Sequence, residues 1–334
     1  MHSALFPDIA AREAGLLPVS DGHSLYWERS GLEGGRALLF LHGGPGSGAS
    51  ARHRRYADPA IWETIQFDQR GCGRSAPLFE LYANTTAHLI EDVEALREHL
   101  GLERFDCVMG ASWGTTLALA YAQAHPERVA NLLVEGVFLA TRRELDWWHG
   151  KSGAGAVYPD AHGWLMHGVP EALHDDPQGF ARWALAAMQT ELAAGAPLLA
   201  KLDDPDAEAA LKDSVIFRWI AYEELLSHLE ATPQSALVNW RAKGRDKLIS
   251  TALIEAHYFS QGCFLEEAQL LTGAHRLTMP VHIVHSRYDM VCPLQSAFDL
   301  KDAAPDATLT IVPAHGHAMS EPVFKVVRNV IAGL

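Results

Sequence analysis

The feature that most constrains this chain is a glycine-flanked serine between a strand-like and a helix-like segment. Residues 105–109 (Phe-Asp-Cys-Val-Met) form a short apolar run typical of a buried strand, and residues 115–123 are rich in Ala and Leu, as helices are. Between them, residues 110–114 read Gly-Ala-Ser-Trp-Gly. The glycines permit a strained turn that lifts the Ser112 hydroxyl off the sheet edge, with a helix N-terminus behind it. We therefore expect a nucleophilic serine at this turn.

The composition fits one large α/β domain, with or without an insertion. The chain has 334 residues, of which 48% are hydrophobic and 20% charged, so a sizeable core is available. The formal net charge of −14 argues against nucleic acid or an anionic membrane as partner. The four cysteines are widely spaced, and the N-terminus has neither the basic nor the apolar region of a signal peptide. We expect a soluble cytoplasmic protein.

The first part of the chain alternates strand-like and helix-like segments. Buried-strand runs occur at 37–41, 64–67 and 132–134, in addition to the run before the serine. Residues 86–100 place apolar side chains at helical spacing, with a glycine directly after them. Strands that alternate with helices predict a mostly parallel sheet with helices on both faces.

The pattern changes after the strand-like run at 132–134. Residues 138–273 contain almost no strand-like runs and are helix-like, with several proline breakers. Strand patterns return at 281–284 and 308–312, and a helix-like tail covers 322–334. We predict a core domain made of residues 1–137 and 274–334, with residues 138–273 inserted as a helical cap.

A serine nucleophile needs a histidine base and a carboxylate that orients the base. Asp289 follows the strand-like run at 281–284, and His317 follows the next strand-like run, so both lie where the strands of such a sheet end. His315 competes with His317, but His317 directly follows Gly316, which gives the loop freedom to aim the ring. We expect Ser112, Asp289 and His317 to act together.

Three other carboxylates near the end of the chain are alternatives to Asp289. A helix-like stretch and the turn after it contain Asp299, Asp302 and Asp306. A solvated helix face explains these residues better than a catalytic role.

The developing oxyanion of an acyl-transfer reaction needs two N–H donors. Residues 42–46 (His-Gly-Gly-Pro-Gly) end a buried strand at the loop that supplies one of them, and we assign this donor to Gly44. The second donor is the backbone N–H of Trp113, which follows the serine.

Four motifs together resemble the proline iminopeptidases. They are residues 42–46, 68–75 (Asp-Gln-Arg-Gly-Cys-Gly-Arg-Ser), 110–114 and 287–289 (Arg-Tyr-Asp). These enzymes are α/β-hydrolases with a helical cap that remove an N-terminal proline from peptides. The resemblance implies the α/β-hydrolase fold, an acyl-enzyme on Ser112, and a peptide or amino-acid amide with a free amino group as substrate.

The resemblance extends into the predicted cap. Residues 219–223 (Trp-Ile-Ala-Tyr-Glu) resemble the family's Trp-x-x-Trp-Glu segment, and residues 254–259 (Ile-Glu-Ala-His-Tyr-Phe) resemble its Glu-Asn-His-Tyr-Phe segment. In that family the two glutamates hold the substrate's free amino group. The resemblance therefore implies this role for Glu223 and Glu255, and a carboxylate pair suits the recognition of an ammonium group.

A proline ring also needs an apolar slot. The candidates for its walls are Trp113, Phe138, Trp148, Tyr258 and Phe259. No metal or organic cofactor is expected.

One departure from the family lies near the site, and other functions stay open. Where the family usually has Arg-Gly after the sixth strand, this chain has Glu135 and Gly136. An anion in place of a cation bears on amine recognition and on the preferred leaving group. An amidase or esterase acting on small amino-acid derivatives with the same triad is the nearest alternative, and a non-catalytic binding module is a more distant one.

Overall fold

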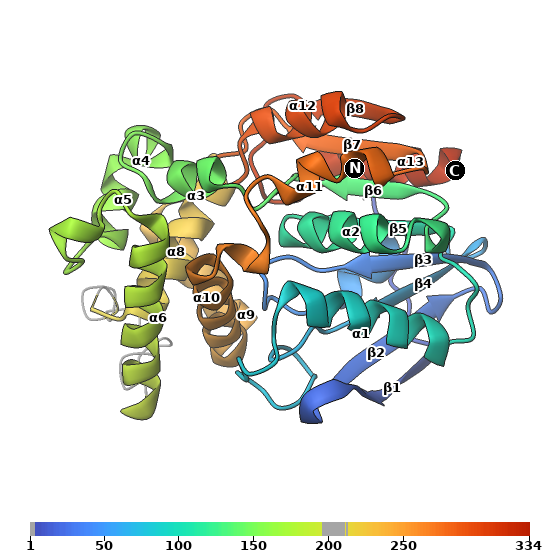
Figure 1. The fold of residues 1–334 in the computed structure, drawn as a ribbon, viewed down its shortest axis with the longest axis horizontal. Helices are drawn as coiled ribbons and strands as arrows, with labels where there is room; N and C mark the ends of the chain where they lie inside the picture. Colours follow the sequence, from blue (N-terminus) through green and yellow to red (C-terminus); the bar gives the residue numbers. More distant parts are fainter. Residues whose placement is uncertain (1–3, 196–210, 212) are drawn as a thin grey trace.

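The computed structural model describes residues 4–195, 211 and 213–334. Figure 1 shows a twisted sheet covered by helices, with a second group of helices beside it. The sheet of the described residues has eight strands in the order β1-β2-β4-β3-β5-β6-β7-β8. β1 pairs antiparallel with β2, and β2 pairs antiparallel with β4, whereas the remaining pairs are parallel. The predicted mostly parallel sheet is therefore confirmed.

The central strands are short apolar runs because both faces of the sheet are covered. In β3, Leu38 and Phe40 belong to the apolar cluster on one face, and Leu39 and Leu41 belong to the cluster on the other. Such near-continuous apolar runs are typical of buried parallel strands. The strands are β1 (Glu13–Pro18), β2 (Ser24–Gly31), β3 (Arg36–Leu41), β4 (Trp62–Phe67), β5 (Cys107–Ala111), β6 (Leu132–Glu135), β7 (Val281–Ser286) and β8 (Ala307–Val312).

The helices that flank the sheet divide between its two faces. One face packs against helices α1 (Thr86–His99), α2 (Trp113–Ala124), α11 (Gln269–Thr272) and α12 (Leu294–Ala303). The other packs against α13 (Glu321–Gly333), whose apolar stripe includes Val323 and Val327. The arrangement places the carboxyl ends of β5, β7 and β8 at one edge of the sheet.

The described part of the segment between β6 and β7 is helical. It contains α3 (Arg142–His149), α4 (Ala154–Val157), α5 (Pro159–Leu165), α6 (Pro177–Ala193), α8 (Val215–Ser227), α9 (Pro233–Lys243) and α10 (Arg245–Ser260). Figure 1 shows these helices beside the sheet, with α6, α8 and α10 packed together. The fold class, an α/β sheet with an inserted helical cap, is confirmed. We use "cap" below for helices α3 to α10.

Helix α10 joins the cap to the loops of the core. The Ser250 hydroxyl donates to the carbonyl oxygen of Gly46 over 2.9 Å, and the Tyr258 hydroxyl donates to Asn84 Oδ1 over 2.9 Å. Both α10 residues are buried. Two turns of one helix are thus fixed to two loops at the carboxyl edge of the sheet.

The four cysteines are all buried and unpaired. None of the helices in the described ranges is long and apolar enough to cross a membrane. The antiparallel strands β1 and β2 were not anticipated from the sequence.

Candidate active site

Ser112 stands at a tight turn between β5 and α2, and the turn requires both flanking glycines. The Ser112 backbone has φ 55° and ψ −127°, a conformation that L-residues rarely adopt. A Cβ at Gly110 would overlap the Gly114 carbonyl, and a Cβ at Gly114 would overlap the Leu41 carbonyl. The strand and helix can approach this closely only without side chains at these positions. The turn leaves the serine hydroxyl at the sheet edge, as the sequence predicted.

Ser112, His317 and Asp289 form a continuous hydrogen-bonded line. His317 Nε2 lies 2.9 Å from Ser112 Oγ, and His317 Nδ1 lies 2.7 Å from Asp289 Oδ2. The other Asp289 oxygen accepts from the backbone N–H groups of Val291 and Cys292, at 3.0 and 2.8 Å. This geometry suits a histidine that accepts the serine proton while the carboxylate orients the ring.

His315 and Asp299, the alternatives to His317 and Asp289, have other partners. His315 Nδ1 faces the Ser320 hydroxyl at 3.3 Å, and the carbonyl oxygen of His315 accepts from the backbone of Tyr288. Asp299 forms an ion pair with Arg143. The structure therefore brings His317 and Asp289, not these alternatives, to the serine.

Burial and pairing shift the pKa values of the acid and the base in opposite directions. Burial by itself lowers the pKa of His317, but the neighbouring Asp289 carboxylate outweighs it, and the pKa lies well above its usual range. Burial tends to raise the pKa of Asp289, yet the adjacent His317 and two backbone N–H groups hold it below its ordinary value. The pair therefore favours the charged imidazolium that forms during acyl transfer.

The thiol of Cys292 lies beside Asp289 and His317. Potential ligand atoms of Cys292, Asp289 and His317 all fall within 4.8 Å of one another. Both His317 nitrogens are already engaged with Ser112 and Asp289, and burial raises the pKa of the Cys292 thiol to about 12. A protonated thiol is a poor metal ligand, so this cluster fits acid–base chemistry better than metal binding.

The two predicted oxyanion donors belong to residues near Ser112, since Trp113 directly follows it and Gly44 lines the same pocket. Trp113 is the first residue of α2, so its N–H has no acceptor within its own helix. The Gly44 loop follows β3, and a Cβ placed on Gly43 would lie only 3.2 Å from Ser112 Cβ. Gly44 itself has φ 106°, which favours glycine at this position.

Gln69 connects the Gly44 loop to the serine turn. Its backbone N–H donates to His42 Nε2 over 3.0 Å, and its side-chain amide donates to the His42 carbonyl over 2.9 Å. The Trp113 indole N–H in turn donates to Gln69 Oε1 over 3.0 Å. Gln69 belongs to the motif at 68–75, so the motif positions the loop and the residue assigned to the oxyanion.

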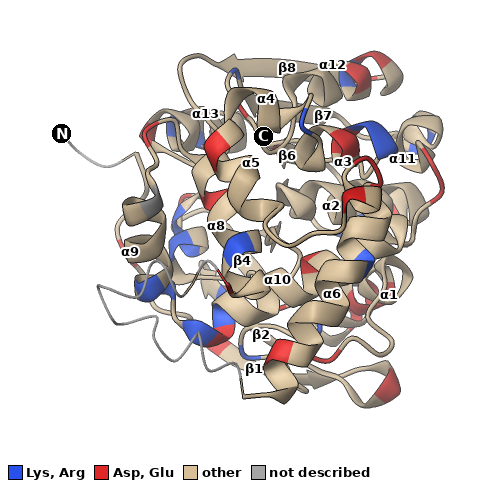
Figure 2. Cartoon of the chain, turned by 90° about the vertical axis from the view of Figure 1, so that its left-hand side faces the viewer, with Lys and Arg blue, Asp and Glu red and all other residues tan. Residues whose placement is uncertain are grey.

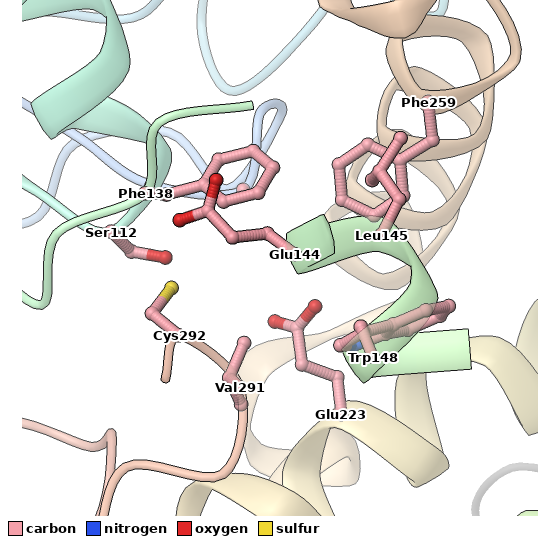
Figure 3. Close-up of a pocket in the computed structure, with 10 residues that line it drawn as sticks. Ser112, Phe138, Glu144, Leu145, Trp148, Glu223, Phe259, Val291 and Cys292 are labelled. Atoms are coloured by element: carbon pink, nitrogen blue, oxygen red, sulfur yellow. The ribbon is translucent and has the colours of Figure 1, made fainter. Parts of the chain in front are cut away.

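A largely apolar pocket opens next to the serine, with about 340 Å³ of empty space that includes its open mouth. Figure 3 shows the Ser112 hydroxyl and the Glu223 carboxylate pointing into this space from different sides. Three predicted aromatic residues help to form the walls, and Phe259 lies 5.8 Å from both Phe138 and Trp148 between ring centroids. The pocket is lined by Gly44, Ser112, Phe138, Glu144, Leu145, Trp148, Glu223, Phe259, Val291 and Cys292.

Two of the aromatic candidates do not line this pocket. Tyr258 is fully buried, and its ring stacks edge-on against Trp113 with centroids 4.7 Å apart. Its hydroxyl is engaged by Asn84. Because successive helical residues point in different directions, Phe259 enters the pocket while Tyr258 supports the serine turn from behind.

The two predicted glutamates lie close together, but only Glu223 lines the pocket, and Glu255 is buried beside it. The Trp219 indole N–H donates to Glu255 Oε2 over 2.7 Å, whereas Glu255 Oε1 is buried without a partner among the described residues. Burial raises the pKa of both carboxyls, and the neighbouring Glu223 raises that of Glu255 well above its usual range. A cation that reached the pair would relieve this repulsion.

Glu144 is a pocket residue that the sequence reasoning missed. Its carboxylate accepts from the backbone N–H groups of Leu139 and Thr141, and from the hydroxyl of Ser296 at 2.6 Å. A signal was present, because Thr141 and Glu144 have the spacing of a helix capping box. No comparable local signal identifies Leu145, Val291 or Cys292, which reach the pocket only through the fold.

Comparison with known proteins places the chain in a family. A family model described as the alpha/beta hydrolase fold matches residues 36–192. The chain is 39% identical to a probable proline iminopeptidase from Leptolyngbya boryana, over 95% of this chain and 92% of that protein. It is 40% identical to the proline iminopeptidase from Xanthomonas citri over 95% of each. The chain belongs to the proline iminopeptidase family. The resemblance identified from the sequence motifs is thus confirmed.

Solved structures agree on the fold of this family member. A proline iminopeptidase from Mycobacterium smegmatis superposes with a TM-score of 0.56 at 20% identity, covering 96% of this chain and 98% of that one. An esterase from Exiguobacterium antarcticum gives a TM-score of 0.62 at 16% identity, covering 96% and 99%. At such identities the likeness concerns the fold alone, and the predicted α/β-hydrolase fold is confirmed.

Proposed function

We propose that this chain is a serine aminopeptidase that releases N-terminal proline from peptides. The observation that carries the proposal is the pocket beside Ser112. It has aromatic walls for a ring, the serine at one side, and for an amino group the carboxylate of Glu223, beside which Glu255 is buried. The membership of the proline iminopeptidase family supports the same substrate.

The hydrogen-bonded line suggests the order of the chemical steps. Ser112 Oγ attacks the carbonyl carbon of the N-terminal residue, and His317 Nε2 takes the serine proton. Asp289 stabilises the resulting imidazolium, while the N–H groups of Gly44 and Trp113 stabilise the oxyanion. His317 then protonates the leaving amine. Water activated by His317 hydrolyses the acyl-enzyme.

The glutamates supply the selection for a free amino group. An ammonium beside Glu223 and Glu255 compensates their buried charge, whereas an acylated nitrogen cannot. The charge-assisted hydrogen bonds would hold the N-terminal residue with its carbonyl at Ser112. The same contacts exclude interior peptide bonds, because the backbone nitrogen of an interior residue is an uncharged amide bonded to the preceding residue.

We further propose the setting in which this site works. Residues 138–273 contain the cap domain, although α11 near their end packs on the sheet, and residues 1–137 and 274–334 form the catalytic core. The substrates are small peptides with a free amino group, and the acidic net charge disfavours nucleic acid. The four unpaired cysteines are compatible with a reducing cytoplasm.

The decisive experiment compares proline β-naphthylamide with its N-acetyl derivative. We expect cleavage of the free-amine substrate only, and its loss in Ser112→Ala. Equal cleavage of both substrates would reject amine recognition and favour the amidase or esterase. If neither is cleaved, or if Ser112→Ala retains the activity, the proposed function is wrong.

A further inference from the structure

A second cavity adjoins Ser112, which lines both this cavity and the proline pocket. It contains about 920 Å³ including its open mouth, and Ser112 and His317 lie in its wall. The proline pocket includes Ser112 but not His317. Because His317 delivers the proton to the departing amine, the residue after the cleaved bond must leave on the side of the second cavity. We call it the leaving-group cavity.

Three basic side chains from separate segments line the leaving-group cavity: Arg52, Lys243 and Lys247. Figure 2 shows the Lys and Arg segments that gather around α9 on this part of the molecule. Lys243 is compensated by Glu224, whose Oε2 lies 2.8 Å from its ammonium. Among the residues that the structure describes, Lys247 has no carboxylate within 4.0 Å, although it is half-buried. Lys247 lines both this cavity and a neighbouring pocket that includes Asp68, without an ion pair to a described carboxylate.

The acidic and titratable groups around this charge do not neutralise it. Glu135 also lines the cavity, but burial raises its pKa to about 8, so it is mostly uncharged at neutral pH. Burial holds the pKa of His53 well below its usual range, so this ring is neutral there. Asp68 lies nearby, and its carboxylate is bound by Arg74 at 2.7 Å. Lys247 and Arg52 are therefore the available cations of this cavity.

Helix α10 carries both Glu255, near the proline pocket, and Lys247, in the wall of the leaving-group cavity. Glu255 and Lys247 are eight residues apart on α10, which is about 12 Å along the helix axis. A dipeptide extends over about 7 Å, and the long lysine side chain can cover the remainder. Ser112 lines both cavities.

We infer that Lys247, assisted by Arg52, binds a carboxylate on the first residue of the leaving group. This inference rests on the proposed aminopeptidase function and adds a substrate class to it. The carboxylate is either the C-terminal group of a prolyl dipeptide or an acidic side chain following proline. The net charge of the protein is −14, which by itself repels such substrates, so a preference for them reports a local contact.

The test is a comparison of kcat/KM for two matched substrate pairs at pH 7. Pro-Gly against Pro-Gly-NH₂ tests the terminal carboxylate, and Pro-Glu-NH₂ against Pro-Gln-NH₂ tests the acidic side chain. We expect about a tenfold preference for the carboxylate in at least one pair. Lys247→Met should remove that preference, and Lys247→Arg should keep most of it. Lys301→Met, an exposed lysine on α12, is the control that keeps the native ratios.

Two results would overturn the inference. One is the absence of a carboxylate preference in both pairs, and the other is a preference that survives unchanged in Lys247→Met. Proline β-naphthylamide separates these from a failure of the proposed function, because it has no carboxylate. If the native protein cleaves it without a carboxylate preference, only the inference about Lys247 fails. If the native protein cleaves none of these substrates, the aminopeptidase and the carboxylate site are rejected together.

Discussion

The Trp219 indole N–H donates to Glu255 Oε2 over 2.7 Å and leaves the other carboxylate oxygen without a partner among the described residues. Trp219 lies on α8 and Glu255 on α10, so the packing of two cap helices fixes the orientation of the carboxylate. An unsatisfied buried oxygen costs free energy in the unliganded protein. A substrate amino group would supply the missing donor.

Glu255→Gln should reduce the recognition of a free amino group. The amide keeps an oxygen for Trp219 but cannot carry the negative charge, so we expect kcat/KM for proline β-naphthylamide to fall about 10- to 100-fold. The selectivity over the N-acetyl derivative should fall with it. Glu98→Gln, which changes an exposed glutamate, is the charge-matched control. A variant with native selectivity would rule out this role for Glu255.

The pH dependence should reflect the raised pKa of His317. Only the neutral ring can take the serine proton, so activity is lost as the pH falls through the pKa of His317. A free imidazole has a pKa of about 6.5. Since Asp289 raises the pKa of His317, the decrease in kcat/KM should be centred above that pH. Asp289→Asn should shift the decrease to lower pH and reduce kcat by about 10⁴.

The carboxyl pair at the amine site also titrates, and its contribution must be separated from that of His317. The pH profile of Glu255→Gln provides this control, because it lacks the more strongly shifted member of the pair. If the decrease in the variant is centred at or below pH 6.5, His317 does not have the raised pKa.

Glu135 should make the protein less stable as the pH rises. Its carboxyl has a pKa of about 8 in the folded chain because of burial, against an ordinary value of 4.5. Between these values the native state binds more protons than the unfolded state, so the free energy of unfolding falls with increasing pH. Glu135→Gln lacks this loss. Its free energy of unfolding, relative to that of the native chain, should therefore increase by a few kcal/mol from pH 5 to pH 9.

Denaturant unfolding at these two pH values measures the effect. The difference between Glu135→Gln and the native chain should be larger at pH 9 than at pH 5. An equal difference at both would mean that the Glu135 carboxyl titrates normally.

Glu144→Ala should destabilise the wall of the proline pocket. The substitution leaves the buried donors of Leu139, Thr141 and Ser296 without their acceptor. We expect the free energy of unfolding to decrease by about 3 kcal/mol or more, and KM for a prolyl substrate to increase. Glu144→Gln retains one acceptor oxygen and should be affected less. Urea unfolding of both variants checks this, and equal stabilities would contradict the role of Glu144.

Much of the core could be predicted because its elements have strong local patterns. The helix expected at 86–100 is α1 (Thr86–His99), and the tail expected at 322–334 is α13 (Glu321–Gly333). Strands β1 and β2 were missed because both belong to the antiparallel part of the sheet, where buried and exposed residues alternate. Leu16 in β1, for example, is 58% exposed, so its strand lacks the apolar run of a buried strand.

The sequence by itself determined the strand–turn–helix around Ser112, the alternation of strands and helices, and the family of the chain. Each depends on residues that are neighbours along the chain, where glycine conformation and apolar spacing act directly. The tertiary structure decided which histidine reaches Ser112, that Trp219 orients Glu255, and that Lys247 and Glu223 line two cavities that share Ser112. These residues are distant in the chain. Parallel strand pairing and cap packing bring them together, and burial then sets their pKa values.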